Sequence, residues 1–324
     1  MESKNAKARI HVSIFMLYLT LLPISTALSG IIGGVSIVNY VAIAYVMIAV
    51  FVSKVRFRLK VDNSALFLYF AYISFSLFWN NNLSFNWYVS TTLLSAITAI
   101  VALSDDYSEA ETAELKRGVI GSFILSVFVT LINADSIKRM RLNISLTSEM
   151  DINDFACGLV VIIALLMSLL YKDKKFNVKA FLALAVCVAI IVFSGSRGAM
   201  LMAGIMLVAW VVMEAVNKKY LPVIVLAALG LMLLASYKFL PEFIQGRLDL
   251  RNLIKDGGSG RSDIWRAAFN KFNESNIVRK FYGYGYGAFR SAVNYIAPGH
   301  DRAYEAHNIF IDMLIEGGLV GLTL

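Results

Sequence analysis

The stretch AFLALAVCVAIIVFSGSRGAMLMAGIMLVAWVVMEAV, residues 180–216, decides the fold of this chain. It is apolar almost throughout; the segment SGSRG, residues 194–198, interrupts it, and Glu214 lies near its end. Because about 20 helical residues cross the hydrocarbon core of a bilayer, the two apolar halves predict two membrane-spanning helices. The interruption then predicts a tight turn between them, with Arg197 at the start of the second helix.

The composition of the whole chain extends this prediction. Of its 324 residues, 58% are hydrophobic and only 16% are charged, and the mean hydropathy is +0.68. A soluble domain carries about 25% charged residues. The sequence therefore predicts an all-α fold, a polytopic transmembrane helical bundle of about ten spans within the lipid bilayer. The spans are expected at about 10–28, 31–52, 64–80, 87–103, 118–133, 155–171, 179–195, 199–216, 220–238 and 307–324.

The distribution of Lys and Arg predicts the orientation of these spans. The net charge is +8 and the pI is about 9.3, which in a soluble protein would indicate nucleic-acid binding. Here the short segments on one side of the spans hold fifteen Lys and Arg residues, and those on the other side hold four. Since cytoplasmic loops are enriched in basic residues, we expect a cytoplasmic N-terminus and no nucleic-acid partner.

One long polar interval divides the chain into three parts. Residues 1–239 contain nine predicted spans, residues 240–306 form a large loop on the outer side, and residues 307–324 form the last span. A loop of this length is usually functional or disordered, but its aromatic residues give it apolar surface to bury. We therefore expect a small helical cap that carries the chemistry. The two cysteines, Cys157 and Cys187, fall in spans and are interpreted as packing residues.

Two arginines follow glycine-containing segments at predicted helix N-termini. Arg197 follows Ser-Gly-Ser, and Arg261 follows GGSG at residues 257–260. A helix N-terminus attracts anions, and the guanidinium fork suits bidentate phosphate binding. Both patterns are compatible with a phosphate site. The alternatives are an interfacial anchor for Arg197 and an ordinary capped helix after Arg261.

Two further segments of the outer loop hold candidate site residues. The segment FYGYGYGAF, residues 281–289, predicts an aromatic turn that is suited to stacking on a sugar ring, or to packing on its own aromatic side chains. His307 lies where the loop re-enters the membrane, and an imidazole that titrates near neutral pH suits a general base. A structural histidine is the alternative. His300 is a rival base, although the preceding Pro298 and Gly299 predict an exposed turn.

The order of these motifs carries a family resemblance. A Ser-Arg-Gly turn comes first, then Gly-Ser-Gly-Arg with a following Trp, then Gly-x-Gly-x-Gly-x-Phe, and finally His-Asn followed by Glu-x-Gly-x-x-Gly. This set, over roughly residues 180–321, resembles the O-antigen ligase and O-antigen polymerase superfamily. The resemblance implies a glycosyltransferase of the bacterial inner membrane. Its donor would be a glycan on undecaprenyl pyrophosphate, transferred at the periplasmic face.

The resemblance also implies roles for individual residues. Arg197 and Arg261 would hold the pyrophosphate, and His307 would activate the acceptor hydroxyl. Supporting positions or glycan contacts are expected at Asn308, Glu316, Tyr284 and Trp265. No metal and no cofactor is implied, and a chain-length regulator is a candidate partner. Because family members usually continue for further spans after His-Asn, the chain is expected to be truncated at its C-terminus.

Three functions remain open on the sequence. An O-antigen or surface-polysaccharide polymerase is preferred, and the alternative within the superfamily is a ligase that transfers the glycan to lipid A–core. The third is a lipid-carrier or solute transporter without chemistry. Ionisable groups at mid-bilayer or paired broken helices are typical of transporters. Here the polar residues gather at one predicted face, which favours chemistry on a lipid-linked substrate.

Overall fold

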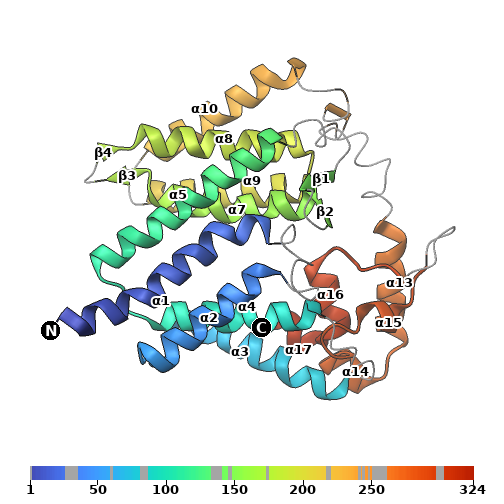
Figure 1. Ribbon diagram of the computed structural model, residues 1–324. Helices are drawn as coiled ribbons and strands as arrows, with labels where there is room; N and C mark the ends of the chain where they lie inside the picture. Colours follow the sequence, from blue (N-terminus) through green and yellow to red (C-terminus); the bar gives the residue numbers. More distant parts are fainter. Residues whose placement is uncertain are drawn as a thin grey trace. The chain divides into compact units, whose positions relative to one another are not determined.

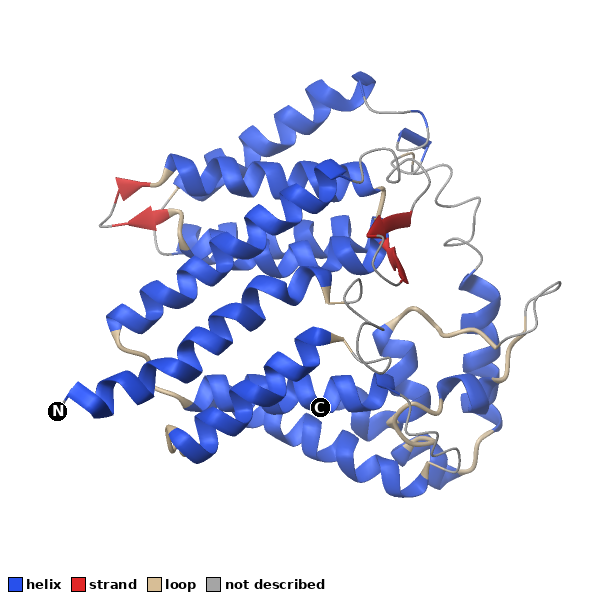
Figure 2. Ribbon diagram, in the orientation of Figure 1, coloured by secondary structure: helices blue, strands red, loops and turns tan. Residues whose placement is uncertain are grey.

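Helices dominate the computed structural model, and two short hairpins accompany them (Figures 1 and 2). The structure describes residues 2–25, 36–58, 61–80, 87–132, 141–144, 148–172, 175–216, 220–239, 242, 245–246, 249, 261–296 and 303–324. The predicted helical fold class is therefore confirmed for these residues, and the hairpins are a small addition to it.

The helices of the first 239 residues follow the predicted spans. They are α1 (Glu2–Leu21), η1 (Leu22–Ile24), α2 (Ile37–Met47), η2 (Ile48–Val52), α3 (Val61–Ser76), η3 (Leu77–Trp79), α4 (Trp87–Ser104), α5 (Glu109–Ile132), α7 (Ile152–Ser168), α8 (Val178–Ser194), α9 (Arg197–Val216), α10 (Leu221–Ser236) and η4 (Tyr237–Phe239). Each of the first nine predicted spans thus contains a helix.

Shorter helices follow in the C-terminal part of the chain. They are α13 (Arg261–Glu274), α14 (Ile277–Tyr282), α15 (Phe289–Val293), α16 (Ile309–Glu316) and α17 (Gly318–Thr323). The hairpins pair β1 (Arg141–Ile144) with β2 (Ser148–Asp151), and β3 (Tyr171–Lys172) with β4 (Lys175–Phe176), both antiparallel. The predicted last span, 307–324, contains two short helices that meet at Gly317.

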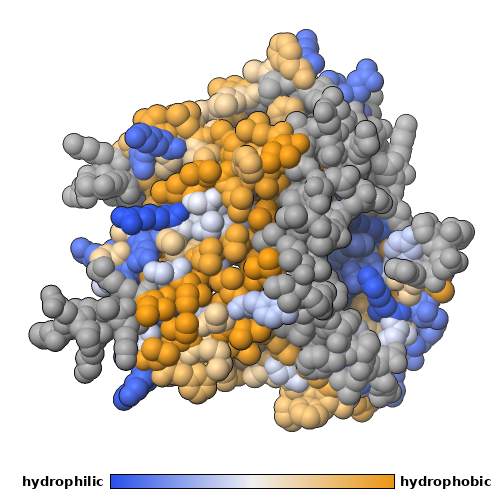
Figure 3. Space-filling model, viewed as in Figure 1, coloured by the Kyte–Doolittle hydropathy of each residue, from blue (hydrophilic) through white to orange (hydrophobic). Residues whose placement is uncertain are grey.

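Length and composition single out two helices as candidate membrane spans. Within the described residues, α5 and α9 are long and apolar enough to cross a bilayer, and seven further apolar helices are shorter. Large apolar side chains are exposed on both, including Phe128 and Leu131 of α5 and Leu201 and Ile205 of α9. Figure 3 shows apolar residues over much of the visible helical surface. The count of ten spans stays a prediction.

The chain forms two compact units that do not follow chain order. Unit 1 consists of Met1–Val41 and Tyr107–Asn252, and unit 2 consists of Ala42–Asp106 and Leu253–Leu324. In unit 1 the helices α7, α8, α9 and α10 pack around one apolar core. The helices α1 and α5 lie side by side, because small residues on α5 allow close approach. A Cβ added at Gly118 would come within 2.8 Å of the Met16 carbonyl oxygen.

The start of α5 corrects the predicted boundary of that span. The sequence predicted a loop to residue 117, whereas the helix already begins at Glu109. Ser108 and Glu111 explain the earlier start, because they form a capping box. The Glu111 carboxylate accepts the Ser108 N–H at 2.9 Å, and the Ser108 hydroxyl oxygen accepts the Glu111 N–H at 3.3 Å.

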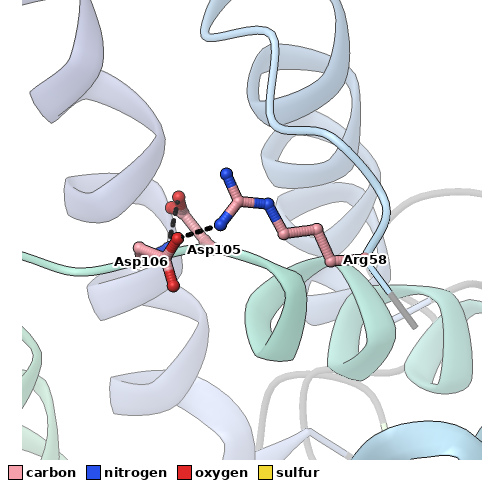
Figure 4. Close-up of polar contacts among 3 residues, drawn as sticks. All are labelled: Arg58, Asp105 and Asp106. Atoms are coloured by element: carbon pink, nitrogen blue, oxygen red, sulfur yellow. Dashed lines mark hydrogen bonds and ion pairs between the residues drawn. The ribbon is translucent and has the colours of Figure 1, made fainter. Parts of the chain in front are cut away.

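Unit 2 combines α3 and α4 with the short C-terminal helices. Helix α17 packs on α3, α14 and α16, while α13 packs on α14, α15 and α16. At the far end of α4, an exposed ion pair joins Arg58 to Asp106, and the Asp105 carboxylate accepts the Asp106 N–H at 3.0 Å (Figure 4). An exposed pair of this kind contributes little stability. We therefore attribute the stability of unit 2 to the packing of its C-terminal helices rather than to this ion pair.

Candidate active site

The candidate site lies in unit 2, where the segments around His307 pack on one small core. The core joins α13, α15 and α16 with residues 303–308. Its buried members are Ile264, Ala268, Phe289, Ala306, Ile311 and Ile315. Ile264 and Ala268 are one helical turn apart, so α13 presents a single apolar stripe to this core. The core fixes the chain on both sides of His307.

His307 lies on an unusual stretch of backbone and has an exposed side chain. Its φ is 51°, in the left-handed region that a non-glycine residue rarely adopts. On one side, the Trp265 indole N–H donates to the carbonyl oxygen of Ala306 at 2.9 Å. On the other side, Asn308 is the N-cap of α16, and its Oδ1 accepts the N–H of Phe310 at 3.1 Å. Trp265 and Asn308 thus hold the backbone at His307, and their expected glycan contacts stay predictions.

A cavity of about 520 Å³ opens beside His307 and lies entirely within unit 2. Helices α3, α4, α15 and α16 form its wall together with the turn that follows α14. The lining residues are Tyr69, Phe70, Thr92, Tyr286, Gly287, Phe289, Arg290, Glu305, His307, Asn308, Ile309, Asp312, Met313 and Glu316. The lining combines carboxyl, hydroxyl, guanidinium and imidazole groups. Such a set suits a ligand with many polar groups.

Three carboxyl groups line this cavity, those of Glu305, Asp312 and Glu316. Glu316, only 6% exposed, accepts the N–H of Phe289 at 3.0 Å. Glu305 pairs with Arg290 across 2.8 Å. A buried carboxyl group is costly unless it is hydrogen-bonded. The Glu316 side chain therefore connects α16 to the start of α15, in addition to lining the cavity.

The glycines of the turn at residues 283–288 permit close packing of backbone on backbone. Gly283 has φ 71° and ψ −168°, a conformation that is essentially restricted to glycine. A Cβ added there would lie 2.2 Å from the carbonyl oxygen of Glu316. The N–H groups of Tyr284 and Gly285 donate to the carbonyl oxygens of Ile315 and Glu316 at 2.9 and 2.8 Å. The turn is thus fastened to the end of α16.

The tyrosines of the turn point to different partners. The Tyr284 hydroxyl lies 2.8 Å from the Ser275 hydroxyl, and the cations of Lys271 and Arg279 lie over its ring. Tyr284 therefore packs between α13 and α14, and its predicted glycan contact stays a prediction. Tyr286 faces α3 and α4 instead. Its N–H donates to Ser76 Oγ at 3.0 Å, and its hydroxyl lies 3.1 Å from Thr92 Oγ1.

Arg261 begins α13, the helix that supports the His307 segment. Its side chain is half-buried. Trp265 follows one helical turn later on the same face, and its indole contacts Ala306. Arg261 is thus one turn away from the residue that contacts the chain next to His307. The preceding GGSG segment, residues 257–260, and the rival base His300 lie outside the described residues.

Arg197 begins α9 in unit 1, as the sequence predicted. Gly195, with φ 66°, ends α8 in the left-handed conformation. The Ser196 N–H then donates to Ser194 Oγ at 3.2 Å, and both serines are buried. A Cβ added at Gly198 would meet no atom within 4 Å. The backbone beside the half-buried Arg197 therefore adjoins open space, and its shared pocket with Arg261 stays a prediction.

A second cavity of unit 2, about 840 Å³ in volume, is mostly apolar. The elements α3, η3, α14 and α17 line it with aliphatic and aromatic side chains, among them Phe75, Trp79 and Tyr282. Arg279 also lines this cavity, and its guanidinium donates to the carbonyl oxygen of Gly283 at 3.1 Å. These two cavities therefore differ in chemistry, and His307 lines the polar one.

Sequence reasoning missed several polar residues of the His307 cavity. Asp312 was missed although it lies four residues before the predicted Glu316 on α16 and on the same face, so this spacing was a usable signal. Arg290, at the start of α15, could have been noticed because it follows the glycine-rich turn. Tyr69 and Thr92 lie in apolar helices remote in sequence, and nothing in their surroundings marks them.

The fold and this site define a class: a helical membrane protein whose C-terminal segments build a polar cavity around a histidine. A comparison with family models agrees, because residues 180–324 match the model described as O-antigen ligase. The match supports the O-antigen ligase and polymerase superfamily for these residues, so the resemblance seen in the motifs is confirmed there. The family acts in ligase- or polymerase-type transfer of lipid-linked glycans in a membrane. No curated protein and no solved structure matches the chain.

Proposed function

We propose that the chain transfers a glycan from undecaprenyl pyrophosphate to an acceptor hydroxyl at the periplasmic face of the bacterial inner membrane. The observation that carries the proposal is the exposed His307 at a polar cavity, inside the segment that matches the family model. Polymerisation of O-antigen or another surface polysaccharide is the form of the reaction that we propose. Transfer to lipid A–core is the alternative form.

In this proposal His307 acts as the general base. Its imidazole takes the proton of the acceptor hydroxyl while the oxygen attacks the anomeric carbon of the donor sugar. The bond from that carbon to the pyrophosphate breaks in the same step, so no covalent enzyme intermediate forms and the anomeric configuration inverts. General-base assistance contributes about 10²–10⁴ in rate. The polar lining of the cavity offers hydrogen bonds to the sugar hydroxyls.

In this proposal Arg197 and Arg261 bind the leaving pyrophosphate. The leaving pyrophosphate gains negative charge as the glycosidic bond breaks, so fixed guanidinium groups stabilise the transition state more than the ground state. Both arginines begin helices, where the dipole adds to their attraction for an anion. The two guanidinium groups take the electrostatic role that a metal ion has in other enzymes, and the proposed mechanism uses no metal ion.

Two experiments test this function. Deletion of the gene followed by a lipopolysaccharide gel distinguishes the two reactions: a single repeat unit on the core indicates a polymerase, and a core without O-antigen indicates a ligase. Unchanged banding would contradict both. A phosphatase fused near Asn273, on the exposed surface of α13, should be active, because the proposed site faces the periplasm. A fusion that is active only with a cytoplasmic reporter would overturn the orientation.

A further inference from the structure

Two tyrosines of α3 line different cavities, and their hydroxyl groups have different partners. Tyr72 lines the apolar cavity, and its hydroxyl donates to the carbonyl oxygen of Gly317 at 2.6 Å. Tyr69, nearly one turn earlier on the helix, lines the polar cavity beside His307, and its hydroxyl donates to the thioether sulfur of Met313 at 3.1 Å. A thioether sulfur is a weak acceptor, unlike a carbonyl oxygen. The Tyr72 hydroxyl is therefore the more firmly bonded of the two.

The weak bond of Tyr69 leaves its hydroxyl able to bind a ligand. The side chain is half-buried at the wall of the cavity, and a phenolic hydroxyl both donates and accepts hydrogen bonds. When a ligand oxygen replaces the Met313 sulfur, a stronger hydrogen bond replaces a weaker one. A site that hydrogen-bonds a hydroxyl group of its ligand also rejects analogues that lack this group. Tyr69 is therefore suited to recognise a hydroxyl group.

The surroundings of Tyr69 suit a sugar ring. The ring of Phe70 lies 5.4 Å from that of Tyr69, edge to face, and both residues line the cavity. The hydroxyl groups of Tyr286 and Thr92, 3.1 Å apart, belong to the same lining. Aromatic rings with a few placed polar groups are typical of small-molecule sites, and the volume of about 520 Å³ is in their usual range. A sugar presents C–H groups to such rings and hydroxyl groups to the polar side chains.

The charged groups of the cavity disfavour a phosphate as its ligand. Glu305, Asp312 and Glu316 line it, and the guanidinium group of Arg290 is already paired with Glu305 across 2.8 Å. Like charges that face each other cost binding free energy. The proposed reaction places the pyrophosphate at two other arginines, at the starts of α9 and α13. A sugar ring without a phosphate therefore suits this lining better.

We propose that the polar cavity binds the sugar of the acceptor, and that the Tyr69 hydroxyl contacts one of its hydroxyl groups. The proposal rests on the proposed function, in which His307 takes the proton of the acceptor hydroxyl. Because Tyr69 and His307 line one cavity, a sugar bound at Tyr69 is presented to the imidazole. Placement matters, since a displacement of about 1 Å in a reacting group can cost about 10²-fold in rate. Tyr69 itself transfers no proton in this scheme.

The first test measures binding and does not depend on activity. The probes are the repeat-unit oligosaccharide released from its lipid carrier, which lacks the pyrophosphate, and the core oligosaccharide released from lipid A. Without a donor no transfer occurs, so the Kd of each probe is measured directly on the purified full chain. For the probe that binds, Tyr69→Phe should raise the Kd by about 3- to 10-fold, because one hydrogen bond is lost. An unchanged Kd, or a wild type that binds neither probe, would overturn the proposal.

Tyr72→Phe is the matched control for this test. It removes the same atom from the same helix, but the lost hydroxyl is the one that donates to the Gly317 carbonyl oxygen. Tyr72→Phe should therefore lower the unfolding temperature in detergent and leave the Kd of the oligosaccharide unchanged. Tyr69→Phe should do the reverse. A lower unfolding temperature with an unchanged Kd in both variants would show that the Tyr69 hydroxyl is structural as well, and would overturn the proposal.

The second test measures glycan transfer by the purified full chain, with the acceptor and the lipid-linked donor varied in turn. Tyr69→Phe should raise KM for the acceptor by about 3- to 10-fold and leave KM for the donor unchanged. A raised KM for the donor alone would assign the cavity to the donor sugar and overturn this inference. Active wild type with an unaffected Tyr69→Phe would overturn the inference alone. A wild type without transfer would overturn the proposed function, whereas weaker oligosaccharide binding by Tyr69→Phe would still support a sugar site.

Discussion

Two turns of the chain both contain glycines, but the space around those glycines differs. The turn at residues 194–198 joins α8 to α9, and a side chain added at Gly198 would point into open space. The turn at residues 283–288 has no such space. A side chain added at Gly283 would collide with the backbone of Glu316, and one added at Gly285 would lie 2.7 Å from Asn80 Cβ.

The difference shows how a glycine-rich motif is to be interpreted. In the first turn a side chain at Gly198 would meet no neighbouring atom, and the N-terminus of α9 beside it is the kind of position that attracts an anion. In the second turn glycine allows one segment of backbone to lie directly on another, and the cavity beside it depends on that packing. The first turn is therefore a candidate binding element, and the second is a structural support of the His307 cavity.

The largest effect is expected from a side chain in the second turn. Gly283→Ala combines a disfavoured backbone conformation, which costs about 1–3 kcal/mol, with a direct collision against Glu316. We expect most of the folded protein to be lost, measured as the amount recovered in membranes and the unfolding temperature in detergent. Gly198→Ala is the matched control and should fold normally. Equal stability of the two variants would remove the distinction between the turns.

A smaller effect, on activity alone, is expected at the two arginines. Arg197→Lys and Arg261→Lys keep the charge but lose the guanidinium fork, so each should lower the rate of glycan transfer by about 10-fold or more. The control is Arg266→Lys, whose side chain is exposed and pairs with Asp263 at 3.6 Å on the surface of α13. Wild-type rates in both variants would show that neither arginine contacts the pyrophosphate.

The smallest effect is expected where the second turn contacts α4. Tyr286→Phe removes the hydroxyl that lies 3.1 Å from Thr92 Oγ1 and should cost about 0.5–1.5 kcal/mol. The unfolding temperature should fall by a few degrees, as estimated from the usual dependence of Tm on stability. A loss as large as that of Gly283→Ala would mean that side-chain contacts, rather than backbone packing, fasten this turn.

The helices were predictable because their signal is local. Runs of apolar residues located a helix in each of the first nine predicted spans, and the turn before Arg197 was predicted from five residues of sequence. The start of α5 was wrong because the capping box of Ser108 and Glu111 was not recognised within an acidic segment. The break at Gly317 was also missed, since apolar residues on both sides suggested one continuous helix.

The cavity was less predictable because it depends on contacts between distant segments. His307 was selected from its place at the end of the polar interval; the structure places it at the cavity, and its role as the base stays a prediction. Tyr69 and Thr92 reach the same cavity from helices more than 200 positions earlier in the chain, and a single sequence contains no signal for that pairing. The contact of the Trp265 indole with the Ala306 carbonyl oxygen, next to the left-handed His307, likewise joins two distant segments.

The most direct measurement is glycan transfer by purified protein with a lipid-linked donor, compared between the wild type, His307→Ala and His300→Ala. We predict that His307→Ala transfers glycan about 10²–10⁴ times more slowly, at an unchanged protein level, and that His300→Ala is milder. Transfer by His307→Ala at the wild-type rate would contradict the account. An inactive His300→Ala beside an active His307→Ala would assign the base to the other histidine.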